Sequence, residues 1–382
     1  MEIFIDGEEK FADLRSEMAK ARRYIHIQYY IIKNDEVFHS MIPILERKAA
    51  EGVQVRILYD SMGCYRMPPK VWRCLREHGI AVRPFHSKLN YRNHRKIVVI
   101  DGKIGYLGGF NIGKEYISRD VKFGHWRDTH LKIGGRAVKE LEKWFARDWC
   151  IAGGTHMWWK RVLRMGKVCA LHGRRVYGPG KTYIRRSVGR YTAGTDGITE
   201  SGQVRIIASG PDTHRYQIRN AYLHLFRSAR HHIYIQTPYF VPDRLILTAL
   251  QTAAQSGIDV RLMIPCKPDH PFVYWATWYF MGRILKAGAR CFLYENGFLH
   301  AKSVLVDGNV ASCGTANMDI RSFRLNYEIN AVIYEKETVN RLEEIFQNDL
   351  QNCREITWEE YQKRRWNIRA KEAFARLLSP LL

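Results

Sequence analysis

Two stretches of this sequence repeat the same chemically active residues at the same spacing. In each, a histidine is followed by a lysine two residues later, an aspartate five residues after that, and an asparagine that ends a Gly-[Gly/Thr]-x-Asn tetrapeptide. The members are His94, Lys96, Asp101 and Asn111 in the first copy, and His300, Lys302, Asp307 and Asn317 in the second. A single copy could arise by chance, but two copies with identical spacing indicate a shared chemical role.

These residue types suit phosphodiester chemistry that needs no metal ion. An imidazole can attack as a nucleophile or transfer a proton near neutral pH, and a lysine ammonium interacts well with phosphate oxygens. One histidine would attack phosphorus and the other would protonate the leaving oxygen, while the lysines and asparagines stabilise the equatorial oxygens. We therefore expect neither a metal nor an organic cofactor. The alternative interpretation is structural, namely two similar strands with partly buried histidines.

The residues that follow each histidine are rich in β-branched side chains, which predicts that the motif lies on a β-strand. Because side chains alternate along a strand, each histidine should share a face with its lysine. Asp101 and Asp307 should then lie on the opposite faces. We interpret these two aspartates as scaffold members of the motif and not as proton donors.

The elements around the motif also repeat. Residues 23–28 match residues 232–236 in character, and residues 49–56 match residues 254–261. Strands that alternate with helices predict an α/β layer architecture. The duplication predicts two α/β sandwich halves, packed about a pseudo-twofold axis, with both motifs in one cleft between them.

The doubled motif resembles that of the phospholipase D superfamily, and the surrounding sequence is most similar to bacterial cardiolipin synthases. The resemblance covers about residues 1–150 and 203–350, and its longest stretches are residues 25–31, 91–116, 126–133, 235–243, 265–277, 295–308 and 314–330. It implies two duplicated phospholipase D-like halves. It also implies transfer of a phosphatidyl group between two phosphatidylglycerol molecules, with release of glycerol, through a covalent phosphatidyl-histidine.

The resemblance further implies roles for individual residues. His94 would be the nucleophile and His300 the general acid, although the repeat itself is symmetric. In the superfamily an acidic residue after each motif bonds a catalytic histidine and sets its tautomer, which points to Asp128 and Glu328. The alternative for both acids is a solvated position or the edge of a strand.

The formal net charge of +23 implies an anionic partner. Anionic phospholipid at a membrane surface is the expected partner, and nucleic acid is not expected. The eight cysteines are dispersed, which indicates neither a zinc site nor a disulfide framework. No run reaches the ~18 apolar residues of a membrane span, and acidic residues stand where a signal peptide would begin. Because related synthases usually begin with transmembrane helices, we expect a naturally short member or a trimmed catalytic part.

The sequence divides into four segments: a first half (1–150), a basic aromatic insert (151–202), a second half (203–350) and a basic amphipathic tail (351–382). The insert contains Trp158 and Trp159, and clustered positive charge beside tryptophan favours contact with an anionic membrane. A solvated linker is the alternative. The tail could lie in a membrane interface or pack on the domain. We expect a peripheral protein of the bacterial cell membrane or its cytoplasmic face.

Three other functions stay open at this point. Water could replace the lipid acceptor, which would make the protein a phospholipase D-type hydrolase, and other phospholipids could serve as donor or acceptor. A nuclease of the same superfamily would also use the net positive charge. The apolar aromatic run at residues 272–280 suits acyl chains better than nucleic acid. A non-catalytic membrane-binding protein is disfavoured by the two intact motifs, and the oligomeric state is not predicted.

Overall fold

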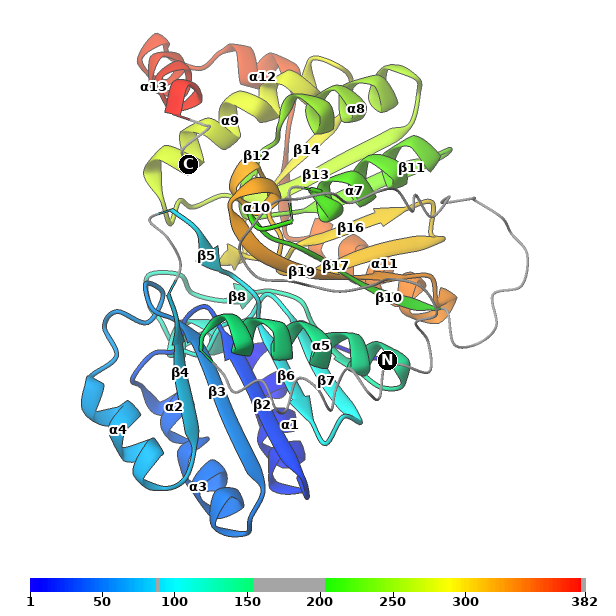
Figure 1. Cartoon of the computed structure of the whole chain (residues 1–382). Coiled ribbons are helices and arrows are strands. Elements are labelled where there is room, and N and C mark those ends of the chain that lie inside the picture. The colour runs from blue at the N-terminus through cyan, green and yellow to red at the C-terminus, as the bar shows by residue number, and fades with distance from the viewer. Residues whose placement is uncertain (87–89, 154–202, 214, 379–382) are drawn as a thin grey trace, which may run out of the picture.

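The computed structural model describes residues 1–86, 90–153, 203–213 and 215–378, which form two α/β halves (Figure 1). The first half contains a seven-stranded sheet in the order β1-β9-β7-β6-β2-β3-β4. Its strands are β1 (Glu2–Phe4), β2 (Tyr24–Tyr29), β3 (Gln54–Asp60), β4 (Ala81–Phe85), β6 (Ile97–Ile100), β7 (Ile104–Gly108) and β9 (His130–Ile133). Its helices are α1 (Gly7–Ala19), α2 (Glu36–His39), α3 (Ile42–Ala50), α4 (Pro69–Glu77), the 3-10 helix η1 (Lys114–Ile117) and α5 (Arg136–Ile151).

The second half contains a sheet whose main path is β10-β19-β17-β16-β11-β13-β14-β20. Its strands are β10 (Val204–Ser209), β11 (His232–Gln236), β13 (Asp259–Pro265), β14 (Arg290–Tyr294), β16 (Ser303–Val306), β17 (Val310–Gly314), β19 (Asn326–Ile333) and β20 (Cys353–Ile356). The helices are α7 (Gln217–Ser228), α8 (Arg244–Gln255), α9 (Pro271–Leu285), α10 (Ile320–Arg324), α11 (Lys336–Leu350), α12 (Trp358–Gln362) and α13 (Trp366–Leu378). Two short strands, β12 (Phe240–Val241) and β18 (Met318–Asp319), pair with each other outside this sheet.

The two sheets share one topology. Reading from β1 and from β10, the first seven strands of each sheet occupy corresponding positions, and only β20 extends the second sheet beyond this match. The central pairs also agree in direction, because β2–β3 and β11–β13 are parallel while β2–β6 and β11–β16 are antiparallel. The expected α/β fold with two duplicated halves is confirmed.

Short strands join the two halves across their interface. β5 (Arg92–Asn93) pairs in parallel with β19 of the second half, and β15 (Phe298–Leu299) pairs in parallel with β8 (Trp126–Arg127) of the first. Each of these exchanged strands ends immediately before a motif histidine. The interface pairing therefore fixes where both histidines begin.

Apolar side chains form three large buried clusters. One lies under the outer helices of the first sheet and one under those of the second. The third lies between the sheets, where Val99 and Leu131 of the first half and Leu305 and Ile329 of the second belong to one cluster with residues of α5 and α11. Burial of apolar surface from both halves makes the interface part of the folded core.

The motif residues do not lie on the strands as expected. β6 begins at Ile97 and β16 at Ser303, so both His-x-Lys segments precede their strands. Asp101 and Asp307 follow the strands and adopt left-handed backbone angles, with φ of 53° and 55°. The prediction from strand alternation is therefore wrong for these residues, because a strand period applies only inside the hydrogen-bonded ladder.

The expected insert spans residues 151–202, of which 154–202, with Trp158 and Trp159, lie outside the described residues. The tail is described to residue 378. There α13 packs against α9 and leaves Trp366, Phe374 and Leu377 largely exposed. Among the described residues, no helix combines the length and apolar character that crossing a bilayer would require.

Candidate active site

Each motif histidine is held by the opposite half of the chain. The backbone N–H of His94 donates to the carbonyl of Tyr327 at 3.0 Å, and that of His300 donates to the carbonyl of Arg127 at 2.7 Å. These bonds continue the exchanged pairings of β5 with β19 and of β15 with β8. The two histidines therefore reach one site only when the halves are packed together.

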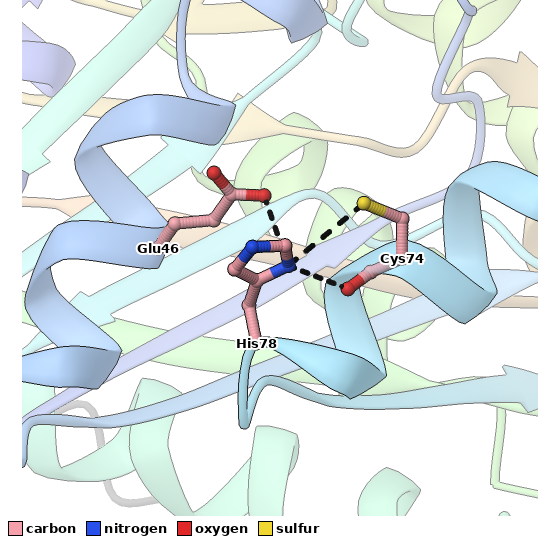
Figure 2. A group of neighbouring side chains, drawn as sticks. All are labelled: Glu46, Cys74 and His78. Carbon is pink, nitrogen blue, oxygen red and sulfur yellow. Dashed lines mark hydrogen bonds and ion pairs between the residues drawn. The ribbon is translucent and has the colours of Figure 1, made fainter.

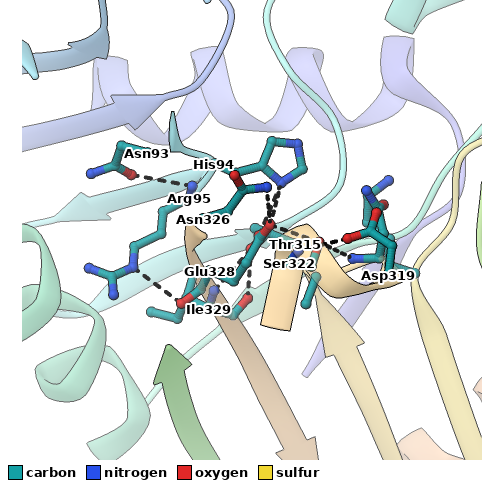
Figure 3. A network of polar contacts seen from close by, with 12 residues as sticks. Asn93, His94, Arg95, Thr315, Asp319, Ser322, Asn326, Glu328 and Ile329 are labelled. Atoms are coloured by element: carbon teal, nitrogen blue, oxygen red, sulfur yellow. Dashed lines mark hydrogen bonds and ion pairs between the residues drawn. The ribbon is translucent and has the colours of Figure 1, made fainter. Parts of the chain in front are cut away.

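The acidic residues also act across the interface. Glu328 lies 3.0 Å from Nδ1 of His94 through each carboxylate oxygen, as Figure 3 shows. Asp128 Oδ2 lies 2.6 Å from Nδ1 of His300. A carboxylate at Nδ1 favours the tautomer that carries its proton there, which leaves Nε2 as the free nitrogen. Both acids that the resemblance singled out thus contact a motif histidine, each in the other half.

Glu328 is completely buried and accepts from several further donors. The hydroxyls of Thr315 and Ser322 donate to it at 2.5 and 3.1 Å, and the Asn326 amide donates at 3.2 Å (Figure 3). Burial acts to raise the pKa of Glu328, but His94, Lys96 and the Thr315 bond together lower it. Glu328 is therefore a carboxylate at neutral pH.

Asp128 occupies a tighter space in the first half. Its carboxylate lies where a side chain at Gly109 would be, because a Cβ there would stand 1.9 Å from Oδ1. Thr315 occupies the corresponding motif position in the second half and bonds the longer Glu328. Burial acts to raise the pKa of Asp128, but Lys302 and His300 outweigh it and lower the pKa. The glycine of the first motif therefore makes room for Asp128, whereas the threonine of the second motif donates a hydrogen bond to Glu328.

Both histidines are neutral in the resting site. Burial lowers the pKa of His94 against the opposing effect of Glu328. Burial, followed by the charge of Lys302, lowers the pKa of His300 to about 4. Nζ of Lys302 lies 2.9 Å from Nδ1 of His300, which explains the strength of the second effect. Neutral imidazoles can act as nucleophile or base, and a bound anion would favour protonation.

The two lysines lie behind the histidines. Lys96 Nζ donates to the backbone carbonyl of His94 at 2.7 Å, and Lys302 Nζ donates to the backbone carbonyl of His300. Both side chains are buried, and burial is the main cause that lowers their pKa values. Among the described residues neither lysine lines the pocket, so their positive charge acts from the layer beneath it.

One pocket of about 430 Å³ brings the two copies together. His94, Asn111, His300 and Asn317 all line it. Asn111 is anchored by the hydroxyl of Tyr116 and the backbone N–H of Ile31, whereas Oδ1 of Asn317 is buried and has no hydrogen-bond partner among the residues that the structure describes. These side chains converge on a space that can hold a phosphodiester.

Several lining residues were not among the sequence-based candidates. The polar ones are Tyr30, Arg92, Tyr239, His270, Asp319, Arg321 and Asn326, and apolar ones include Val241, Phe272 and Val273. Burial raises the pKa of Asp319 to about 6. All of these residues fall within the stretches that carried the resemblance, but nothing in residue type or spacing marked them as site residues.

Asp101 and Asp307 lie outside the pocket. Asp101 accepts from the backbone N–H groups of residues 22, 23 and 24, and Asp307 accepts from those of residues 230, 231 and 232. Each aspartate therefore fixes the segment that enters the central strand β2 or β11. These bonds agree with the interpretation of Asp101 and Asp307 as scaffold members of the catalytic motif, and neither carboxylate contacts a pocket residue through them.

Buried arginine pairs support the site from below. Arg95 binds Asp148 through Nη1 at 2.7 and 2.8 Å, and it also donates to the carbonyls of Glu328 and Ser209 in the second half. Arg127 bonds Asp349 across the interface at 2.7 Å. Burial with full pairing makes these charges specific connectors between the halves, since removal of one partner would leave an uncompensated charge.

In the part of the chain that the structure describes, one group of side chains could hold a metal ion, on the surface formed by α3 and α4 (Figure 2). Nδ1 of His78 lies 3.5 Å from Glu46 Oε1 and 3.8 Å from Cys74 Sγ. The same nitrogen is bonded to the Cys74 carbonyl at 2.9 Å, so a metal would have to displace that bond. None of the three residues lines the pocket.

Comparison with known proteins identifies the family to which the chain is similar. The family model described as "Cardiolipin synthase, PLD-like domain" matches residues 14–149 and 222–350. A cardiolipin synthase of Listeria innocua and the major cardiolipin synthase of Bacillus subtilis are each 45% identical over 390 residues. Each alignment covers 100% of this chain and 75% of the relative, so the chain spans three quarters of their length.

Solved structures show the same fold at low sequence identity. A phosphatidylserine synthase of Haemophilus influenzae aligns with a TM-score of 0.73 at 15% identity, covering 100% of this chain and 95% of the other. A polyphosphate kinase of Porphyromonas gingivalis aligns with a TM-score of 0.60 at 14% identity, covering 99% and 52%. The fold, the doubled motif and the identity to curated relatives agree: the chain belongs to the cardiolipin synthase family of phospholipase D-like enzymes.

Proposed function

We propose that this protein synthesises cardiolipin by transferring a phosphatidyl group from one phosphatidylglycerol to another through a covalent intermediate on His94. The observation that carries the proposal is the crosswise arrangement of the site. Two histidines share one pocket, and Nδ1 of each lies within hydrogen-bonding distance of a buried carboxylate from the other half. Nε2 of one histidine can then attack phosphorus. Nε2 of the other can give a proton to the leaving oxygen or take one from the entering hydroxyl.

In the first step Nε2 of His94 forms a bond to phosphorus, and the bond from phosphorus to the glycerol oxygen breaks. His300 gives its Nε2 proton to that oxygen, and glycerol leaves. In the second step His300 removes the proton from a hydroxyl of the second lipid, whose oxygen attacks phosphorus and releases His94. One phosphodiester replaces another, so no external energy source is required.

His300 must be protonated to act as the acid, although its pKa in the empty site is about 4. The negative charge of the donor phosphodiester opposes this shift, because a nearby anion favours the charged imidazolium. Lys96 and Lys302 lie buried beneath the pocket, where their ammonium groups would attract the phosphate, and Asn111 and Asn317 supply neutral donors at the pocket wall. Preorganised charge of this kind stabilises the pentacoordinate transition state.

The apolar side of the pocket supports the assignment of a lipid as the substrate. Val241, Phe272 and Val273 line it, and Phe272 is 54% exposed. We propose that the protein works at a membrane surface. The side chains of Trp366 and Leu377 on α13 are exposed and would contact that surface. The insert that contains Trp158 and Trp159 would add to this contact.

Covalent labelling with product analysis tests the proposal. Wild-type protein mixed with detergent-dispersed phosphatidylglycerol should form cardiolipin and glycerol, and rapid acid-free quenching should trap a phosphatidyl group on His94. His94→Ala should lose label and product together. Phosphatidic acid as the main product would identify a hydrolase, and label that survives in His94→Ala but disappears in His300→Ala would reverse the two roles.

A chelator tests the metal-free chemistry. Activity on soluble short-chain lipid should survive a strong chelator, because the pocket offers imidazoles and amides backed by buried lysines. A divalent ion that is still required with this substrate would contradict the proposed chemistry. A requirement seen only with vesicles would instead reflect the charge of the bilayer.

A further inference from the structure

A second pocket lies beside the catalytic pocket, and we call it the arginine pocket. It has a volume of about 650 Å³ and is lined by four arginines, which are Arg244, Arg283, Arg324 and Arg376. They come from α8, α9, α10 and α13, and three of these helices, α8, α9 and α13, lie at the outer end of the second half (Figure 1). A concentration of guanidinium groups from four separate helices indicates an anionic ligand.

Within the described residues, most of this positive charge has no acidic partner. The acidic lining residue is Asp243, which is buried, pairs with Arg219 at 3.2 Å and lies 3.8 Å from Arg324. In the part of the chain that the structure describes, Arg244, Arg283 and Arg376 form no ion pair. These three guanidinium groups are therefore available to a ligand that carries negative charge.

The remaining wall of the arginine pocket is apolar. Leu247, Phe280, Ile320 and Leu325 line it, and Tyr279 lies under Arg376 with 5.1 Å between guanidinium and ring centre. Beside the lining arginines in sequence, Leu245, Phe374 and Leu377 are 53%, 57% and 73% exposed. A ligand with a phosphate group and hydrocarbon chains would match both kinds of surface, whereas free phosphate would use the arginines alone.

The two pockets share a wall. Val241 lines the catalytic pocket, and the next residue, Pro242, lines the arginine pocket. Likewise, Asp319 lines the catalytic pocket and Ile320 lines the arginine pocket. Consecutive Cα atoms are about 3.8 Å apart. A lipid in the arginine pocket would therefore be an immediate neighbour of the lipid that reacts, separated from it by β12, β18 and α10.

We propose that the arginine pocket binds the phosphate of a second anionic phospholipid of the bilayer, next to the reacting one. Its acyl chains would run along the apolar wall and the exposed side chains of α8 and α13. The proposal rests on the proposed function, since it assumes that the catalytic pocket faces an anionic membrane. The bound lipid would hold the mouth of the catalytic pocket against the surface from which substrate is drawn.

Binding to vesicles tests the arginine pocket. The test variant is Arg244→Gln with Arg283→Gln, and the control is Lys70→Gln with Arg73→Gln, which removes the same charge from α4 in the first half. All four side chains are exposed, so thermal unfolding should be unchanged. On phosphatidylcholine vesicles that contain phosphatidylglycerol, the test variant should bind about tenfold more weakly than the control. On vesicles without anionic lipid the two variants should match.

Equal loss in the two variants would overturn the proposal, because it would show a general effect of net charge. Soluble short-chain phosphatidylglycerol should displace the wild-type protein from vesicles at concentrations where inorganic phosphate does not. Equal displacement by inorganic phosphate would overturn the lipid assignment and identify a simple phosphate site. If the test variant unfolds at a lower temperature, the single changes Arg244→Gln and Arg283→Gln repeat the comparison.

Product analysis separates this proposal from the proposed function. With detergent-dispersed phosphatidylglycerol, the test variant should retain the turnover number of the wild type, because neither arginine lines the catalytic pocket. A wild-type protein that makes no cardiolipin, combined with the expected difference in vesicle binding, would reject the proposed function and keep the arginine pocket. Loss of turnover in detergent by the test variant would reject a purely membrane-holding role for the pocket.

Discussion

Neutralising the two buried acids one at a time should separate the two chemical steps, because each acid bonds a different histidine. Glu328→Gln removes the carboxylate from His94, the proposed nucleophile, and Asp128→Asn removes it from His300, the proposed acid. Both changes preserve the size of the side chain. Their effects should differ when the leaving group of the donor is changed.

The magnitude follows from the contacts of Glu328. A hydrogen bond to a charged group contributes about 1.5–3 kcal/mol, and each 1.36 kcal/mol corresponds to a factor of about ten in rate. Loss of the bond to His94 should therefore slow phosphatidyl transfer by about 10²-fold, and loss of tautomer control would add to this. Thr315 and Ser322 donate to different oxygens of Glu328, so one hydroxyl can still donate to the amide oxygen of the glutamine while the other accepts from its NH₂ group, and the fold should persist.

The assay measures covalent labelling with two donors, phosphatidylglycerol and a phosphatidyl ester of p-nitrophenol. Glu328→Gln should slow labelling by both donors. Asp128→Asn should slow labelling only by phosphatidylglycerol, because p-nitrophenolate leaves without a proton. Glu337→Gln, an exposed acid on α11, is the control. Normal labelling by both donors in Glu328→Gln would refute the reasoning, as would equal losses in the two variants with both donors.

Three further changes probe the framework of the site. Gly109→Ala would place a Cβ 1.9 Å from Asp128 Oδ1, and we expect loss of natural-substrate turnover comparable to that of Asp128→Asn; normal turnover would show that the carboxylate can move. Asp307→Ala removes three backbone hydrogen bonds and should lower the free energy of unfolding by about 2–3 kcal/mol, measured by urea denaturation, with an unchanged KM. The pKa of His300 is about 6.5 in the unfolded chain and about 4 in the native protein. Between these pH values the unfolded chain binds a proton that the native protein does not bind. The free energy of unfolding should therefore decrease by up to about 3 kcal/mol as the pH is lowered through this window. His300→Gln should remove that part of the pH dependence, and an unaltered dependence would contradict the assigned shift.

The sequence alone was sufficient for the duplication and for most of the functional residues. A motif that repeats at fixed spacing reports local chemistry, and alternating strand and helix patterns report the α/β layers. His94, His300, Asn111 and Asn317 all line one pocket, and both acids contact a motif histidine. The starts of the two motif strands were predicted too early, because the β-branched pattern was extended to the His-x-Lys segments that precede β6 and β16 in the structure.

The tail illustrates a choice that periodicity could not make. The tail was predicted to be amphipathic, and α13 forms there over Trp366–Leu378, but the pattern did not say which face would be buried. The structure buries Glu372 and Ala375 against the domain and exposes Phe374 and Leu377. Glu372 can be buried because Arg364 binds both of its carboxylate oxygens at 2.8 Å, a partner eight residues away.

Only the tertiary structure decided how the two motif copies are combined. The sequence places Asp128 near the first histidine and Glu328 near the second, yet each acid bonds the histidine of the other half. Exchange of β5 and β15 between the halves produces this crossing, and no local pattern encodes it. The position of Arg244, Arg283, Arg324 and Arg376 around one pocket likewise depends on the packing of four helices. Spacing along the chain determines which chemical groups are present, whereas long-range packing determines which of them meet.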